Sequence, residues 1–321
     1  MGPGRADAVD STLDAADRPV QRRVILSPHP DDAVWSLGGA IAAWARHGEV
    51  LVVTVFDGEP PDDGAPAPSS VDPRARVGGS ASRHDDADPA HRWRGLGAAP
   101  RRQQEDAVAI ADLGAKLLPL GLREAAFRQE VDGRFSHSAP ASLFASVDPG
   151  QWPDPSPALL ERLRAVLRPD DLVIAPLAVG RHVDHCLVHR AARQLVPSPS
   201  FYMEFPYAET AEGPAVQQHL DTLGLRLGRV RLPVAWSPWV RAASRYRSQV
   251  LRLFGSGRVF AQQLARFAGV AADVAGAGAT GSMWVVLPST ASGIATEAQN
   301  VASAEPATMD AACWIWSTRD R

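Results

Sequence analysis

The chain is organised around residues 24–39, Val-Ile-Leu-Ser-Pro-His-Pro-Asp-Asp-Ala-Val-Trp-Ser-Leu-Gly-Gly. The apolar start of this stretch predicts a short buried strand, and two prolines end it. Apolar residues then recur at helical spacing over 33–43. His29, Asp31 and Asp32 lie between the two elements, where open α/β sheets build their sites. They could bind a metal and leave one carboxylate spare, or the Asp pair could simply cap the helix.

A second stretch repeats this arrangement. Residues 172–177, Leu-Val-Ile-Ala-Pro-Leu, are apolar and of strand length, and a turn containing glycine follows. Residues 182–185, His-Val-Asp-His, then precede a predicted helix over 186–195. His182 and His185 would share one face if the helix has begun, although such a pair alone is ordinary on a surface helix. Because parallel strands end at one edge of a sheet, we expect the two polar groups to converge.

These two groups carry a resemblance to a known family. Residues 29–32, His-Pro-Asp-Asp, and 182–185 look like the paired motifs of the PIG-L, or LmbE-like, zinc-dependent de-N-acetylases. Arg102–Gly114 resembles a helix of the family that begins with Arg-x-x-Glu and ends in Leu-Gly, and Phe201–Ala208 and Tyr246–Gln249 are similar to segments of its bacterial secondary-metabolism branch. The resemblance implies an α/β fold: a Rossmann-like, mostly parallel sheet with helices on both faces and the site at the C-terminal strand edge.

The resemblance also implies a metal site. The family's ligand positions fall on His29, Asp32 and His185, which would hold one zinc ion and leave a coordination position open. His189, one turn beyond His185, is an alternative ligand outside the matched motif. Asp31 cannot readily share the ion with Asp32, because adjacent side chains diverge. We therefore expect Asp31 to be the general base that takes a proton from water.

The second motif supplies the other expected catalytic residues. His182 would stabilise the oxyanion as a cation, or protonate the leaving nitrogen, and Asp184 would orient it. Two positions depart from the family pattern. Ala33 follows the Asp pair where many members have an acidic residue, and Gly180 and Arg181 stand where some members place a tyrosine.

Three residues are candidates for contacts to a substrate. Arg102 lies on a predicted helix over 101–115, and guanidinium groups suit hydroxyl-rich or anionic ligands, although a surface ion pair with Glu105 is the alternative. Asp57 follows a predicted strand over residues 50–56, where it could face the site or form a simple turn. Glu124 is a loose match to an acidic position of the family.

Composition limits the classes of partner. The net charge of −3 over 321 residues gives no basic footprint for nucleic acid. Two cysteines argue against a disulfide framework and favour a cytoplasmic protein. No apolar run approaches the ~20 residues of a membrane span, and residues 1–19 lack the centre of a signal peptide. We expect a small-molecule partner, an N-acetylated sugar or glycosylated substrate, no membrane partner and a possible homo-oligomer.

The expected organisation is a mobile extension over 1–20, a single deacetylase domain over 21–288 and a tail over 289–321. Residues 59–100 are rich in proline, glycine and aspartate without a period, which predicts a long loop, either covering the substrate or solvated. Its candidate sugar contacts are His84, His91, Trp93 and Arg94. Later in the chain, residues 238–253 predict one long helix, and residues 283–287 an edge strand.

The function expected from these features is metal-dependent hydrolysis of a linear amide. The enzyme would remove an N-acetyl or other acyl group from an amino sugar, or from a natural product that bears one. Two alternatives stay open: an amidase acting on a larger amide or thiol conjugate, and a non-catalytic, sugar-binding family member. Nucleotide binding is not favoured, because the first strand lacks a Gly-x-Gly-x-x-Gly turn.

Overall fold

The structure is a computed structural model. It describes residues 21–59, 99–137, 139–209, 213–225, 227–269, 280–288 and 315–316. The predicted extension over 1–20, nearly all of the predicted loop over 59–100 and most of the predicted tail lie outside the described residues. The predicted division into domains and the four candidate sugar contacts of the loop therefore stay predictions.

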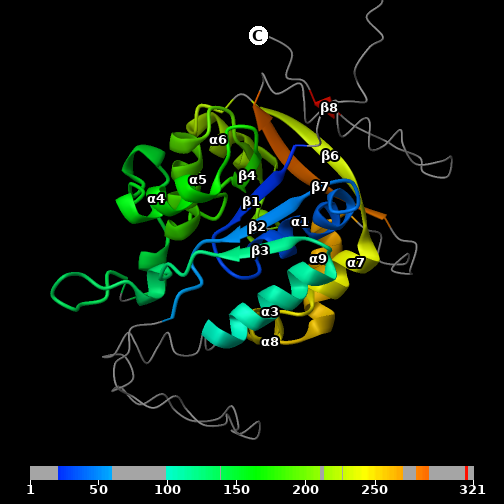
Figure 1. Cartoon of the computed structure of the whole chain (residues 1–321), viewed down its shortest axis with the longest axis horizontal. Coiled ribbons are helices and arrows are strands. Elements are labelled where there is room, and N and C mark those ends of the chain that lie inside the picture. Colours follow the sequence, from blue (N-terminus) through cyan, green and yellow to red (C-terminus); the bar gives the residue numbers. More distant parts are fainter. Residues whose placement is uncertain are drawn as a thin grey trace, which may run out of the picture.

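The fold is built on one mixed sheet with the strand order β3-β2-β1-β4-β5-β7-β6-β8 (Figure 1). Five strands pair in parallel: β1 (Arg23–Ser27), β2 (Val50–Thr54), β3 (Lys116–Pro119), β4 (Leu172–Pro176) and β5 (Ser200–Tyr202). Three antiparallel strands extend the sheet: β6 (Leu227–Ala235), β7 (Thr280–Pro288) and β8 (Ile315–Trp316). The mostly parallel α/β fold expected from the sequence is confirmed.

Helices cover both faces of the sheet (Figure 1). One face carries α1 (Asp32–Trp44), α3 (Ala99–Asp112), α7 (Trp236–Ala243), α8 (Arg247–Phe254) and α9 (Gly257–Phe267). The other carries α4 (Pro157–Val166), α5 (Val183–Leu195) and α6 (Gly213–Thr222). Within β1, Ile25 packs into the first layer, whereas Val24 and Leu26 pack into the second. This alternation buries the central strand on both sides, which explains its continuous apolar sequence.

Two predictions for the C-terminal half were wrong. The long helix predicted over 238–253 is two helices, α7 and α8, with a break between them. Glu105 accepts hydrogen bonds from the backbone N and Oγ of Ser248, at 3.0 and 2.5 Å, and so stabilises a new helix start that an apolar stripe does not reveal. The predicted edge strand is β7, which lies between β5 and β6. A short apolar run does not encode its place in the sheet.

The strand β3 and the length of the helices are two further features of the fold. The strand β3 was not predicted from the sequence, because its four residues carry no clear period. Within the ranges that the structure describes, no helix combines the length and the apolar character that crossing a membrane would require.

Candidate functional site

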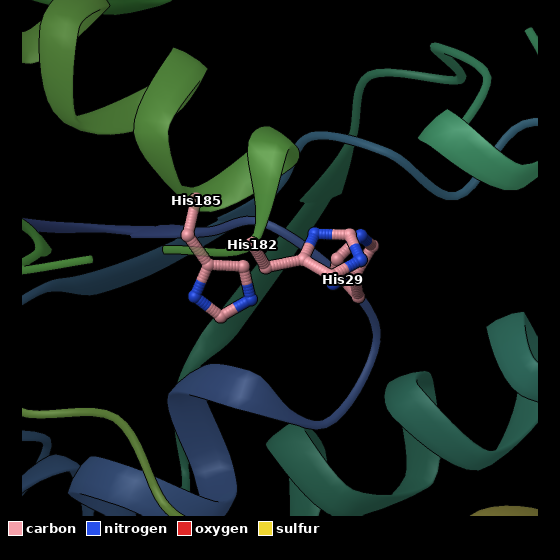
Figure 2. Close-up of side chains that lie close together, drawn as sticks. All are labelled: His29, His182 and His185. Carbon is pink, nitrogen blue, oxygen red and sulfur yellow. The ribbon is translucent and has the colours of Figure 1, made fainter. Parts of the chain in front are cut away.

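The site lies where β1 and β4, neighbours in the sheet, end at the same edge. The loop after β1 carries His29, and the loop after β4 leads through His182 into α5, which carries His185. Figure 2 shows the three imidazoles grouped together, and their ligand nitrogens lie within 4.8 Å of one another. Segments far apart in the sequence therefore form one group of metal-type ligands.

Asp32 joins two of these imidazoles through one carboxylate oxygen. Its Oδ2 accepts a hydrogen bond from the backbone N of His29 at 2.9 Å and lies 3.1 Å from the Nδ1 of that residue. The same oxygen is 3.2 Å from Nε2 of His185. All four predicted residues of this half of the site are buried: His29, Asp31, Asp32 and His185.

The site is electrostatically suited to a cation. Burial opposes charge on the imidazoles, but the neighbouring carboxylates Asp184 and Asp32 raise the pKa of His29 to about 10. Asp32 and Glu204 likewise raise the pKa of His185 to about 9. Burial alone would raise the pKa of Asp32, yet the two histidines hold it well below its usual range. The carboxylates thus favour positive charge at this point.

One buried atom points to a metal ligand. Within the part of the chain that the structure describes, Nε2 of His185 is among the few buried side-chain polar atoms without a hydrogen bond. It nevertheless lies 3.2 Å from the Asp32 carboxylate. An imidazole nitrogen and a carboxylate oxygen that face each other without a hydrogen bond can both bind the same metal ion. Zinc accepts nitrogen and oxygen ligands of this kind. The residues present therefore fit the metal that the sequence motifs imply.

Asp31 precedes α1 in an unfavourable backbone conformation. Its φ is 108°, which costs a residue with a side chain on the order of 1–3 kcal/mol. The side chain makes no cap hydrogen bond to the helix, so helix capping does not account for it. Burial, and then the charge of Asp32, raise the pKa of Asp31 well above its usual range. The strained turn thus holds a second carboxylate, with a raised proton affinity, beside the first.

Asp184 has a different partner from the one expected. Its carboxylate accepts hydrogen bonds from Nη2 of Arg128 at 2.5 Å and from the backbone N of Ala125 at 2.8 Å. It lies 2.9 Å from Nε2 of His29, but 4.0 Å from Nδ1 of His182. The expectation that Asp184 orients His182 through its carboxylate does not match this arrangement, because the bonds from Arg128, Ala125 and His29 fix that carboxylate toward the first motif.

His182 forms the N-cap of α5. Its Nδ1 accepts a hydrogen bond from the backbone N of Asp184 at 3.3 Å. Burial, and then the charge of His29, lower the pKa of His182 to about 3. The imidazole is therefore neutral, which differs from the cation expected from the sequence, and the hydrogen bond at Nδ1 leaves the ring proton on Nε2.

The three candidate substrate contacts line one small pocket next to the histidines. Its walls are Pro30, Phe56, Asp57, Gly58, Ala99, Arg102, Glu124 and Phe127. Nη1 of Arg102 donates to both carboxylate oxygens of Glu124, at 3.0 and 3.1 Å. Oε2 of Glu124 is 3.9 Å from Nε2 of His29, which places the pocket beside the metal-type ligands. Asp57 also accepts a hydrogen bond from the backbone N of Gly121, so it has a turn role as well.

Two of the alternatives from the sequence are not realised. Arg102 pairs with Glu124 rather than with Glu105. His189 lies away from the group: its Nδ1 is 2.9 Å from the carbonyl oxygen of Pro176, and its ring stacks on Phe201 at 4.5 Å.

Two polar residues of the site were not predicted from the sequence. Arg128, which contacts Asp184, follows a short helical turn in a loop-rich region and left no recognisable signal. Glu204, which lies 3.0 Å from Nδ1 of His185, stands within 201–208, a stretch already similar to the family. A glutamate inside an otherwise apolar and aromatic run was a signal in the sequence that could have found it.

Comparisons with known proteins agree with this architecture. The family model described as PIG-L, GlcNAc-PI de-N-acetylase, matches residues 24–196. A 2'-N-acetylparomamine deacetylase of Streptomyces fradiae is 31% identical over 204 residues, which are 62% of this chain. The chain spans 62% of the length of that relative.

Solved structures share the fold. A deacetylase of the teicoplanin biosynthesis pathway, in a complex with bog, superposes with a TM-score of 0.52 at 21% identity, over 84% of this chain and 99% of that chain. The A40926 pseudoaglycone deacetylase Dbv21 superposes with a TM-score of 0.51 at 23% identity, over 84% and 98%. The teicoplanin deacetylase Orf2 in its zinc inhibited form gives a TM-score of 0.52 at 21% identity, over 84% and 99%. With the family model matched across both histidine motifs, the chain belongs to the PIG-L family.

Proposed function

We propose that this protein is a zinc-dependent hydrolase that removes an N-acetyl group from an amino sugar, or from a natural product that bears one. The observation that carries the proposal is the Asp32 carboxylate between His29 and His185, with Asp31 next to it. The similarity to a 2'-N-acetylparomamine deacetylase supports an N-acetylated amino-sugar substrate. A cytoplasmic setting, expected from the two cysteines, and a homo-oligomeric state belong to the same proposal.

His29, Asp32 and His185 would hold the zinc ion. Two imidazoles and one carboxylate are a donor set found in catalytic zinc sites. When bound, zinc would supply Lewis-acid polarisation of the amide carbonyl and lower the pKa of a water.

Asp31 acts as the general base in this proposal. An amide is a poor electrophile, so its hydrolysis at neutral pH needs a water that loses its proton as it attacks. Asp31 is buried, and its pKa is raised by burial and by Asp32, so its carboxylate has a higher proton affinity than an exposed aspartate. The same proton then passes from Asp31 to the leaving amine.

His182 acts as a neutral donor. Because its Nδ1 accepts from the backbone of Asp184, the ring proton is on Nε2. That N–H can donate a hydrogen bond to the carbonyl oxygen as negative charge develops there, and it needs no prior protonation at neutral pH. Asp184, with Arg128 and Ala125, holds the imidazole of His29.

In this proposal, Arg102, Glu124 and Asp57 contact the substrate from the polar side of the small pocket beside His29. Nη1 of Arg102 already donates to both carboxylate oxygens of Glu124, which fixes both groups in place before a substrate enters. Phe56 and Phe127 add apolar side chains to the lining of this pocket.

Metal content and amine release test this function together. We expect about one zinc per chain in the purified protein and little in His185→Ala, by elemental mass spectrometry. 2'-N-acetylparomamine and a panel of N-acetylated amino sugars should release a primary amine and acetate with the zinc-loaded wild type only. Absence of metal after zinc loading would overturn the zinc site, and zinc without amine release from any of these amides would favour the sugar-binding alternative.

A further inference from the structure

The turn after β5 contacts His185 on the side that faces away from Asp32. Its residue Glu204 is fully buried. Oε1 of Glu204 lies 3.0 Å from Nδ1 of His185 and accepts a hydrogen bond from the backbone N of Ala178 at 2.7 Å. Oε2 accepts a longer bond, 3.4 Å, from the backbone N of Val179. One carboxylate thus ties the β5 turn to the loop that follows β4 and to His185.

These bonds determine which nitrogen of His185 carries a proton. Glu204 receives two backbone N–H groups, and a carboxylate in this position acts as an acceptor, so Nδ1 of His185 is the donor. In the neutral ring, Nε2 is then the nitrogen with a free lone pair. It is this atom that lies 3.2 Å from the Asp32 carboxylate without a hydrogen bond.

Tyr207 from the same turn packs against the ring of His185. Its ring meets the ring of His185 edge to face, with 5.4 Å between the centroids. It also fills the space beside Gly180, where an added Cβ would lie 2.2 Å from Cδ1 of Tyr207. The glycine therefore allows a tyrosine from a different element to approach the second histidine motif.

We propose that Glu204 is a positioning residue that fixes the tautomer and the orientation of His185 for metal binding, with Tyr207 limiting the movement of the ring. The inference rests on the proposed zinc site. A carboxylate on the second nitrogen of a metal-binding histidine holds the ring in its coordinating orientation and makes the imidazole a stronger donor. This role of Glu204 also explains why a charged residue is buried in the apolar stretch 201–208.

Zinc affinity, measured by competition with a chromophoric chelator at neutral pH, tests the proposal without relying on activity. Glu204→Ala should bind zinc about 10–100-fold more weakly than the wild type. Glu204→Gln should lose less, because one amide oxygen can accept the bonds from both Ala178 and His185. Asp106→Asn is a matched control, since Asp106 is also a buried carboxylate that accepts two hydrogen bonds, and its zinc affinity should stay at the wild-type value.

The outcomes separate this inference from the proposed function. Wild-type affinity in Glu204→Ala, together with loss of zinc in His185→Ala, would overturn the role of Glu204 and leave the zinc site intact. Failure of the wild type to bind zinc would overturn both. Where Glu204→Ala does not fold, long-range proton–nitrogen spectra of the zinc-loaded wild type decide the question: His185 should carry its proton on Nδ1, and a proton on Nε2 would refute the proposal.

Discussion

Nε2 of His185 and Oδ2 of Asp32 lie 3.2 Å apart, although the two residues belong to different helices and different motifs. Each helix begins just after a strand, α1 after β1 and α5 after β4, and those strands are parallel neighbours. The contact is therefore a consequence of strand order. It makes the carboxylate of Asp32 the centre of the site and leaves the adjacent Asp31 for a different task.

The two aspartates should separate into a metal ligand and a base. Asp31→Asn should retain zinc but lose nearly all turnover, because the amide keeps the shape of the side chain and cannot take a proton. Asp32→Asn should lose zinc, because it removes the charge that faces His29 and His185. Zinc content and amine release of both variants check this prediction, which fails if Asp31→Asn is the variant that loses the metal.

The Arg102–Glu124 pair should contribute to both stability and substrate binding. Arg102→Met should lower the free energy of unfolding by about 3–5 kcal/mol, since it leaves a buried carboxylate without its partner. Adding Glu124→Gln should restore much of that stability, because the unpaired charge is removed.

Activity distinguishes the two roles of this pair. If Arg102 also contacts substrate, the double variant should be stable but should bind substrate poorly, with a raised KM. Denaturant unfolding and steady-state kinetics measure the two effects. Full activity in the stable double variant would show that the pair is only structural.

Gly180 should tolerate no side chain while Tyr207 is present. Gly180→Ala would place a methyl group against the tyrosine ring, and overpacking of this kind costs about 1–3 kcal/mol. Tyr207→Ala in the same chain should relieve the clash, so that the two changes together cost less than the sum of the single changes. A double-mutant cycle by chemical unfolding measures this coupling, and additive effects would contradict the predicted contact.

Asp106 should make stability depend on pH. It is buried, accepts hydrogen bonds from Thr54 and Tyr246, and burial raises its pKa to about 6. Between about pH 4 and about pH 6 the unfolded chain ionises this group while the folded chain keeps it protonated. The folded state therefore loses stability as pH rises through this range, by up to about 3 kcal/mol, and the loss stays constant above it.

Asp106→Asn removes this titration. The stability of the wild type relative to the variant should fall from about pH 4 to about pH 6 and then level off. The free energy of unfolding of both proteins is measured across this pH range. Because the two proteins share all other titrating groups, the difference between them isolates the effect of Asp106. A difference that does not change with pH would mean that Asp106 has an ordinary pKa.

Some features could be predicted from the sequence because they are local. The apolar runs of β1 and β4, the residues that end them and the helical spacing that follows are written in consecutive residues. The two histidine motifs lie at those strand ends, and the parallel arrangement was enough to predict that they meet. The ligand set and most of the pocket candidates came from the resemblance of these motifs to the PIG-L family, and Arg128 and Glu204 were not predicted.

Tertiary structure alone decided which polar groups pair. The carboxylate of Asp184 bonds to His29 rather than to His182, and Arg102 pairs with Glu124 rather than with Glu105. Glu204 reaches His185 from another strand end. The reason is physical. Periodicity records which face of an element is buried, whereas a buried carboxylate must find donors wherever packing brings them, often far along the chain. The sequence thus determined where the site would be, and packing determined its hydrogen bonds and the protonation of its histidines.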